Sequence, residues 1–170
     1  SGIYVPSKAF GEYVEETCHT PNITADELKA RLDAGDDIVV LDSRPMDEFR
    51  RMNIPTGIDC PGAELAYRVH DIAPTPETMV VVNCAGRTRS IIGAQSLINA
   101  GIPNPVMALR NGTMGWTLAG YELERGSERP PPAVTEQGLA RAQACAESVA
   151  QRAGVASIDR ATLDKWRSEA

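Results

Sequence analysis

A cysteine between a predicted strand and a predicted helix is the residue of this chain best placed to do chemistry. Residues 79–82 are apolar without polar alternation, which is typical of a strand covered on both faces of a parallel sheet. We expect a helix after it, with Ser90 as its N-cap and Gly101 at its end. The short loop between the two begins at Cys84.

The composition of this loop predicts an anion-binding site. In an open α/β sheet, ligands bind at the carboxyl ends of the strands. All residues from 85 to 90 carry a backbone N–H, and Gly86 lets the loop curl. Amides curled above a helix N-terminus bind anions. With Cys84 at the mouth of this loop, these dipoles and the positive charges of Arg87 and Arg89 should favour its nucleophilic thiolate. The candidate loop residues are Ala85, Gly86, Arg87, Thr88, Arg89 and Ser90.

Composition limits the classes of partner. The chain has 170 residues, of which 42% are hydrophobic and 24% charged, as in a soluble globular protein. Its net charge of −6 argues against nucleic-acid binding and requires any anion site to be local. We find no apolar run long enough to span a membrane and no signal-peptide pattern. We therefore expect no nucleic-acid or membrane partner, and a cytoplasmic location.

The cysteines do not form a metal-binding pattern. No Cys-x-x-Cys occurs, and only two histidines accompany them, so zinc-finger spacing is absent. We expect no metal and no other cofactor. A domain of this size does not need disulfides, which favours reduced thiols. Apart from Cys84, we assign no chemical role to the cysteines, which are Cys18, Cys60 and Cys145.

Strands and helices alternate from about residue 23 to residue 125, which favours a parallel sheet flanked by helices. Before this region, residues 7–17 are predicted to be a helix. Within it, Thr24 and Glu27 form a capping box that opens a helix. Further predictions are a strand over 38–41, a helix beginning at Pro45, a short strand near 58, a helix over 63–72, a strand over 105–109 and a short helix that buries Trp116.

Two further candidates follow the strand predicted over residues 38–41. Asp42 lies at the same sheet edge as Cys84, and we expect it to brace the cysteine loop. Arg44 is four residues before Glu48 on a predicted helix. We therefore expect these two side chains to pair, in preference to a contact between Arg44 and a substrate.

The composition changes after residue 126. Residues 127–134 are rich in proline and are predicted to be a linker. The segment 135–170 is predicted to be helical, with one apolar stripe in its alanine-rich part. Residues 157–166 repeat the pattern of residues 22–31, with Ile, a capping residue and Leu at matching steps. The segment therefore suggests the start of a following repeat, although two unrelated capped helices would look similar.

The loop from Cys84 to Arg89 resembles the active-site loop of the rhodanese-like sulfurtransferases. The similarity extends over residues 22–125, through Leu41-Asp42-Ser43-Arg44, Ile54-Pro55-x-Gly57 and Asn111-Gly112-x-x-Gly115-Trp116. It is nearest to internal domains of bacterial proteins with several rhodanese repeats. The family often has His where this chain has Asn53, and Gly where it has Asn111.

This resemblance implies a five-stranded parallel sheet with helices on both faces. It implies a domain over 22–126, after an N-terminal extension over 1–21, with neighbouring rhodanese-like domains in the same polypeptide. It also implies that Cys84 accepts a sulfane sulfur from a small anionic donor such as thiosulfate. The resulting persulfide would pass its sulfur to cyanide or a thiol.

Two alternatives remain at this point. Cysteine phosphatases and arsenate reductases use a similar loop, Cys-x-x-x-x-x-Arg. In this chain Ser90 stands at that arginine position, and the arginine comes one residue earlier, at Arg89. A catalytically idle interaction or regulatory domain is the second alternative, although the intact Cys84 argues against it.

Overall fold

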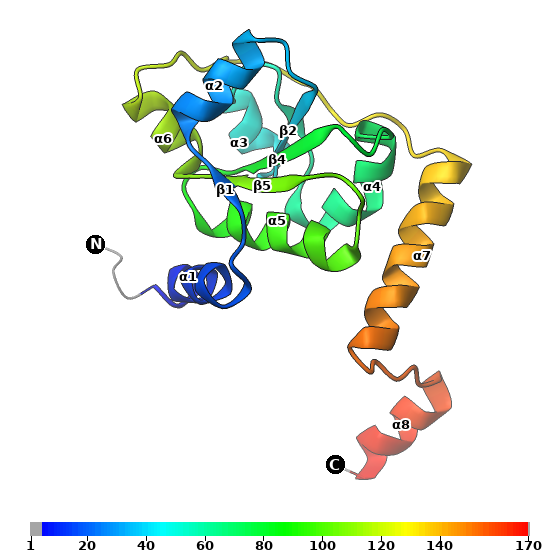
Figure 1. Ribbon diagram of the computed structural model, residues 1–170. Coiled ribbons are helices and arrows are strands. Elements are labelled where there is room, and N and C mark those ends of the chain that lie inside the picture. Colours follow the sequence, from blue (N-terminus) through cyan, green and yellow to red (C-terminus); the bar gives the residue numbers. More distant parts are fainter. Residues whose placement is uncertain (1–4, 170) are drawn as a thin grey trace.

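The computed structural model describes residues 5–169 (Figure 1). Residues 1–4 of the predicted extension and Ala170 lie outside the described residues. The elements in chain order are α1 (Pro6–Cys18), β1 (Asn22–Ile23), α2 (Ala25–Asp33), β2 (Ile38–Asp42), α3 (Met46–Arg51), β3 (Ile58–Asp59), a 3-10 turn (Gly62–Glu64), α4 (Leu65–Ile72), β4 (Met79–Asn83), α5 (Thr88–Ala100), β5 (Val106–Leu109), α6 (Gly112–Leu118), α7 (Glu136–Arg152) and α8 (Arg160–Glu169).

The strands form one parallel sheet of five strands in the order β1-β5-β4-β2-β3. The strand before Cys84, β4, is central, and all its residues except Met79 are buried. The predicted parallel sheet with helices on both faces, followed by C-terminal helices, is confirmed. The first strand, β1, was not predicted from its residues, because two residues are too few to show a periodic pattern.

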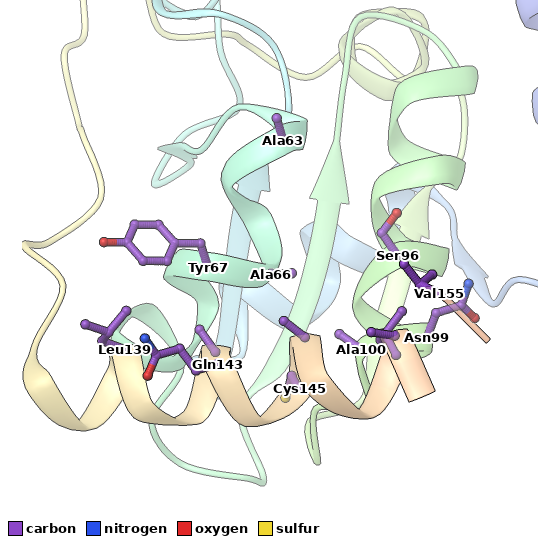
Figure 2. A pocket seen from close by; sticks show the side chains of 14 residues that line it. Ala63, Ala66, Tyr67, Ser96, Asn99, Ala100, Leu139, Gln143, Cys145 and Val155 are labelled. Carbon is purple, nitrogen blue, oxygen red and sulfur yellow. The ribbon is translucent and has the colours of Figure 1, made fainter. Parts of the chain in front are cut away.

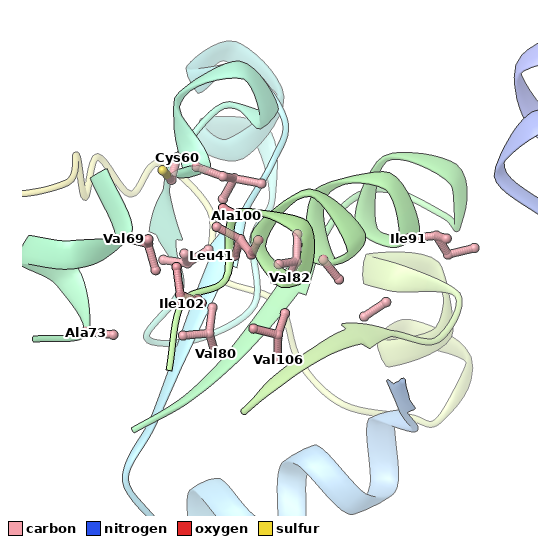
Figure 3. Packing of buried hydrophobic residues seen from close by; sticks show 14 residues of the cluster. Leu41, Cys60, Val69, Ala73, Val80, Val82, Ile91, Ala100, Ile102 and Val106 are labelled. Carbon is pink, nitrogen blue, oxygen red and sulfur yellow. The ribbon is translucent and has the colours of Figure 1, made fainter. Parts of the chain in front are cut away.

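Helices cover the two faces of the sheet with separate apolar clusters. Figure 1 shows α2, α3 and α6 on one side, and α1, α4 and α5 on the other. The larger cluster joins the sheet to α4 and α5 (Figure 3). The smaller cluster includes Leu28 of α2 and Trp116 of α6. Trp116 is 1% exposed and its indole N–H donates to the carbonyl of Glu122 over 2.9 Å, which confirms its predicted packing role.

Two of the predicted helix caps are present, and one is not. Thr24 and Glu27 form the predicted capping box of α2, and Gly101 ends α5 with a left-handed φ of 78°. The prediction of Ser90 as N-cap of α5 is wrong: the helix begins at Thr88, with Arg87 at the N-cap position. The Ser90 hydroxyl instead donates to the Arg87 carbonyl over 2.8 Å, so it turns back into the loop.

Helix α7 packs across α4 and α5 (Figure 2). Its start is fixed by Asp71 of α4, whose carboxylate accepts bonds from the Thr135 hydroxyl at 2.6 Å and the Thr135 amide at 3.2 Å. A cavity of about 660 Å³ lies between the three helices, and none of its lining residues belongs to the Cys84 loop. The α7 segment is therefore attached to the domain, but remote from the predicted site.

The remaining C-terminal residues differ in how they are held. Residues 127–134 contain no helix or strand, but Arg129 donates to the Gly57 carbonyl at 2.7 Å and to Asn53 Oδ1 at 2.9 Å. Helix α8 has no buried residues, and Asp159 accepts a bond from the Thr162 amide at 2.8 Å before its first turn. Within residues 5–169, no helix combines the length and apolarity needed to cross a membrane.

We expect the core of α5 to dominate stability. Leu97 is fully buried, whereas its neighbour Ile98 is 37% exposed. Leu97→Ala should lower the free energy of unfolding by about 2–5 kcal/mol, because it leaves a cavity. Ile98→Ala, the control, should cost less than about 1 kcal/mol. Urea titration measures both values, and equal losses in the two variants would contradict the packing described.

Candidate active site

Cys84 follows β4 directly and lies at the floor of the loop. Its exposed fraction is 2%, so the expectation of a thiol at the mouth of the loop is wrong. The Cys84 Sγ lies 3.6 Å from the Ser90 Oγ, to which the thiol donates. Because Ser90 is in the first turn of α5, the sulfur is directed toward the N-terminus of that helix.

The backbone amides above Cys84 are unpaired. Among the residues that the structure describes, no hydrogen bond is donated by the amides of residues 85–90. The first amide of α5 with a backbone partner is that of Ile91, which donates to the Arg87 carbonyl at 3.1 Å. The first amides of a helix have no partner within the helix, and they carry the positive end of its dipole. This loop therefore offers free donors to an anion at the sulfur.

Helix α6 holds the opposite side of the same loop. The amide of Thr113 donates to the Cys84 carbonyl at 2.9 Å, and the amide of Met114 donates to the Ala85 carbonyl at 3.1 Å. Gly112 approaches so closely that an added Cβ would lie 2.1 Å from the Cys84 carbonyl oxygen. The carbonyls of Cys84 and Ala85 are thus bound by α6. This support was not predicted from the sequence, in which the Asn111-Gly112 pair is its local signal.

The departure from the family at Asn111 has a simple explanation. Asn111 adopts a left-handed φ of 61°, which glycine enters most easily and asparagine enters more readily than most other residues. The other departure, Asn53, is fully buried and its side-chain amide donates to the Phe49 carbonyl at 3.2 Å. Neither Asn111 nor Asn53 donates a hydrogen bond to the Cys84 carbonyl, which is bound by Thr113.

The two arginines of the loop are paired with glutamates. Arg89 binds both carboxylate oxygens of Glu48 at 2.8 and 2.9 Å, and this bond lowers the pKa of Glu48. Arg87 donates to Glu15 and lies 3.6 Å from Glu12. The sequence predicted that both arginines would present free positive charges to the thiol. Because both are paired, they do not. Glu12, Glu15 and Glu48 escaped that analysis because 41 to 75 residues separate them from these arginines.

The predicted pair of Arg44 and Glu48 is wrong. Arg44 instead binds Asp42 through Nε and Nη2, at 2.8 and 2.7 Å, and donates to the Met52 carbonyl at 2.7 Å. The Arg44 side chain is 4% exposed, and a buried guanidinium needs several fixed acceptors. The partly exposed Glu48 is left for Arg89. None of these Arg44 bonds reaches the Cys84 loop.

Asp42 meets the residue before Cys84. Its Oδ2 accepts a bond from the Asn83 side-chain amide at 2.9 Å, and Ser43 donates to the Asn83 carbonyl through its amide and its hydroxyl at 2.9 and 2.8 Å. Asp42 thus contacts the strand end that carries the thiol. On its other side, Asp59 is paired in register with Asp42. Burial, together with the Asp42 charge, raises the pKa of Asp59 to about 6.

The other cysteines lie apart from these contacts. All four cysteines are free. Cys60 is fully buried in the larger apolar cluster, and burial raises the pKa of its thiol to about 12. Cys18 is exposed, and Cys145 is half-buried on α7. No hydrogen bond described for residues 5–169 joins any of these three to the Cys84 loop.

The fold and the site together define an α/β domain with a cysteine at the floor of an amide-rich loop. Residues 24–119 match the rhodanese-like domain, and the chain belongs to this family. A thiosulfate sulfurtransferase from Pseudomonas aeruginosa, of known crystal structure, is 57% identical, with 97% of this chain covered and a TM-score of 0.92. This chain spans 31% of that protein.

Two less similar proteins have names that do not mention sulfur transfer. A helix-turn-helix-type transcriptional regulator from Mycobacterium tuberculosis is 31% identical over 105 residues, which are 62% of this chain and 45% of the regulator. A Rhodopseudomonas palustris protein of unknown function, described as a possible tyrosine phosphatase, is 26% identical. The match covers 73% of this chain and 98% of that protein, with a TM-score of 0.58. This chain is thus similar to proteins that bear different names.

The close approach of α6 to the loop should make Gly112 intolerant of any side chain. Gly112→Ala should lower the free energy of unfolding by about 3–4 kcal/mol, from backbone strain and the clash with the Cys84 carbonyl. Gly120 is the matched control, since its φ of +86° is also left-handed but no atom lies within 4 Å of an added Cβ. Gly120→Ala should cost about 1–2 kcal/mol. Urea titration that gave equal losses would contradict the contact.

The buried Asp59 should make stability depend on pH. Its pKa of about 6 exceeds the ordinary value of 3.8, so the folded state binds a proton more tightly than the unfolded chain. The contribution of Asp59 to wild-type stability should therefore fall as the pH rises from about 4 to 6, and the loss should persist above 6. Asp59→Asn should be about 1–2 kcal/mol more stable than wild type at pH 7.5, but not at pH 4. Glu147→Gln, at an exposed site, is the control and should show no such difference.

Proposed function

We propose that this domain is a sulfurtransferase that carries a sulfane sulfur as a persulfide on Cys84. The observation that supports this most strongly is the set of unpaired amides of residues 85–90, above a thiol aimed at the start of α5. A persulfide ends in an anionic sulfur, and these donors suit it. The similarity to the Pseudomonas thiosulfate sulfurtransferase supports the same reaction class.

The first step uses the Cys84 thiolate as nucleophile. The sulfur attacks the outer sulfur of thiosulfate, a bond forms between the two sulfurs, and the bond from that outer sulfur to the sulfite group breaks. Sulfite leaves with the electron pair, so a thiolate and a dianion give an anionic persulfide and sulfite. The Ser90 hydroxyl already donates to the Arg87 carbonyl, so the loop amides are the donors left for the terminal sulfur.

The second step returns the enzyme to its starting state. Cyanide or a thiolate attacks the terminal sulfur of the persulfide, and the sulfur–sulfur bond breaks toward Cys84. With cyanide the products are thiocyanate and the Cys84 thiolate. The two steps form a ping-pong cycle in which no metal or organic cofactor takes part.

A phosphatase reaction fits the loop less well. The arginine of a cysteine phosphatase would fall at Ser90, whose hydroxyl contacts the Cys84 sulfur. The nearest arginine, Arg89, is bound to Glu48 on α3. A phosphate in the loop would therefore lack the guanidinium that holds its oxygens in such enzymes. Hydrolysis of an aryl phosphate that is lost in Cys84→Ser would favour the phosphatase.

An idle regulatory domain is the other alternative, and the similarity to a transcriptional regulator gives it some support. Such a domain does not need a thiol beneath free amides. Alkylation of Cys84 at the rate of an ordinary exposed thiol would support this alternative.

We also propose that the domain works beside other domains of the same polypeptide. The division into an extension over 1–21, a domain over 22–126, a linker over 127–134 and a helical segment over 135–170 is part of this proposal. Asp159 caps the first turn of α8 as Thr24 caps α2, which supports a following repeat. The free cysteines suit a reducing, cytoplasmic compartment.

The decisive experiment is sulfur loading followed by mass spectrometry. After incubation with thiosulfate, the wild-type protein should gain the mass of one sulfur atom on the peptide that contains Cys84, and cyanide should remove it with release of thiocyanate. Cys84→Ser should abolish both results, because the nucleophile is lost. Cys18→Ser, at an exposed cysteine, is the control and should behave as wild type. An unmodified Cys84 in the wild type would overturn the proposed function.

A further inference from the structure

Helix α1 is fixed against the end of α5 that carries the Cys84 loop. Gly11 of α1 is buried, and a Cβ added there would lie 3.0 Å from Cγ2 and 3.2 Å from Cα of Thr88. After α1, the buried Thr20 hydroxyl donates to Gln95 Oε1 of α5 at 2.8 Å. Helix α1 lies outside residues 24–119 that match the family. It nevertheless borders the first residue of α5, next to the loop.

This contact places two carboxylates on one arginine of the loop. Glu12 and Glu15 are three residues apart and share a face of α1. Glu15 binds Nη2 of Arg87, and Glu12 lies 3.6 Å from Nη1. The Glu15 side chain is 17% exposed, whereas that of Arg87 is 42% exposed. The group of three side chains carries a net charge of −1, beside a loop built to receive an anion.

The second arginine of the loop is neutralised from another helix. Glu48 of α3 binds Arg89 through both carboxylate oxygens. Three carboxylates therefore face the two guanidinium groups that the loop sequence offers to an anion. An anionic donor that enters the loop must either break these ion pairs or come close to the carboxylates. The repulsion between the donor and the carboxylates rises with the negative charge of the donor.

We propose that Glu15, assisted by Glu12, is a specificity-determining residue that disfavours dianionic sulfur donors relative to monoanionic ones. This inference rests on the proposed function. Thiosulfate is the dianion of interest, and an alkyl thiosulfonate is a monoanion that presents the same terminal sulfur. With a thiosulfonate, the Cys84 thiolate attacks the terminal sulfur, the bond to the sulfonyl group breaks, and a sulfinate leaves with the electron pair. Both donors give the same persulfide and differ in charge at the loop.

The test compares the two donors in the same transfer to cyanide. We would measure kcat and KM for thiosulfate and for methanethiosulfonate with the wild type, Glu15→Gln and the double variant Glu12→Gln/Glu15→Gln. The matched control is Glu16→Gln, an equal charge change at an exposed position of α1. Cys84→Ser reports any transfer that does not pass through the thiol.

We expect Glu15→Gln to lower the KM for thiosulfate by about threefold to fivefold, the factor that corresponds to one exposed ion pair. The KM for methanethiosulfonate should change less, so that the ratio of kcat/KM values shifts toward the dianion. The double variant should shift it further, and Glu16→Gln should not. Raising the ionic strength should reduce the difference between wild type and variant, because salt screens these charges.

The outcomes separate the two proposals. If the wild type transfers sulfur through Cys84 and the donor ratio is unchanged in both glutamine variants, the inference about Glu15 is wrong and the proposed function stands. An equal change in KM for both donors would mean that Glu15 only anchors α1, and would also overturn the inference. If the wild type forms no persulfide from either donor, both proposals fail.

Discussion

The hydrogen-bond polarity of the loop from Cys84 to Ser90 is the constraint on which the candidate site depends. Helix α6 takes the carbonyl oxygens of Cys84 and Ala85, and the amides of residues 85–90 have no partner in the described part of the chain. A segment with its carbonyls bound and its amides free has a positive side and a neutral side. The sulfur of Cys84 points toward α5, where those amides and the helix dipole combine.

The free hydrogen-bond donors beside the sulfur therefore belong to the backbone. Both loop arginines are held by glutamates, and the buried guanidinium of Arg44 is held by Asp42. The free amides of the loop therefore give a protein of net charge −6 a local site for an anion. Backbone dipoles also cannot move away or change protonation, so they are fixed before the anion arrives.

Segments on either side of the matched region pack on the same scaffold. Helix α1 meets the start of α5, and α7 crosses α4 and α5 farther from the loop. The first contact brings glutamates to Arg87, whereas the second contributes no residue to the loop. The two flanking helices thus have different relations to the site, which the order of the chain alone does not reveal.

The sequence by itself determined the strand, loop and helix around Cys84, the parallel sheet, and the caps at Thr24 and Gly101. These features depend on neighbouring residues, on periodicity and on turn chemistry, all of which are local. The first strand escaped because its two residues pair through a partner 86 positions away, as Asn22 with Ala108 and Ile23 with Leu109.

Only the tertiary structure decided which charges meet and which backbone groups stay free. Glu48 pairs with Arg89 and not with the nearby Arg44, because the Arg44 side chain is buried and binds the buried carboxylate of Asp42. Gly112 and Glu15 act on the loop from distant parts of the chain. Such contacts depend on how the layers pack, and the spacing of residues along a chain carries no record of the distance between them in space.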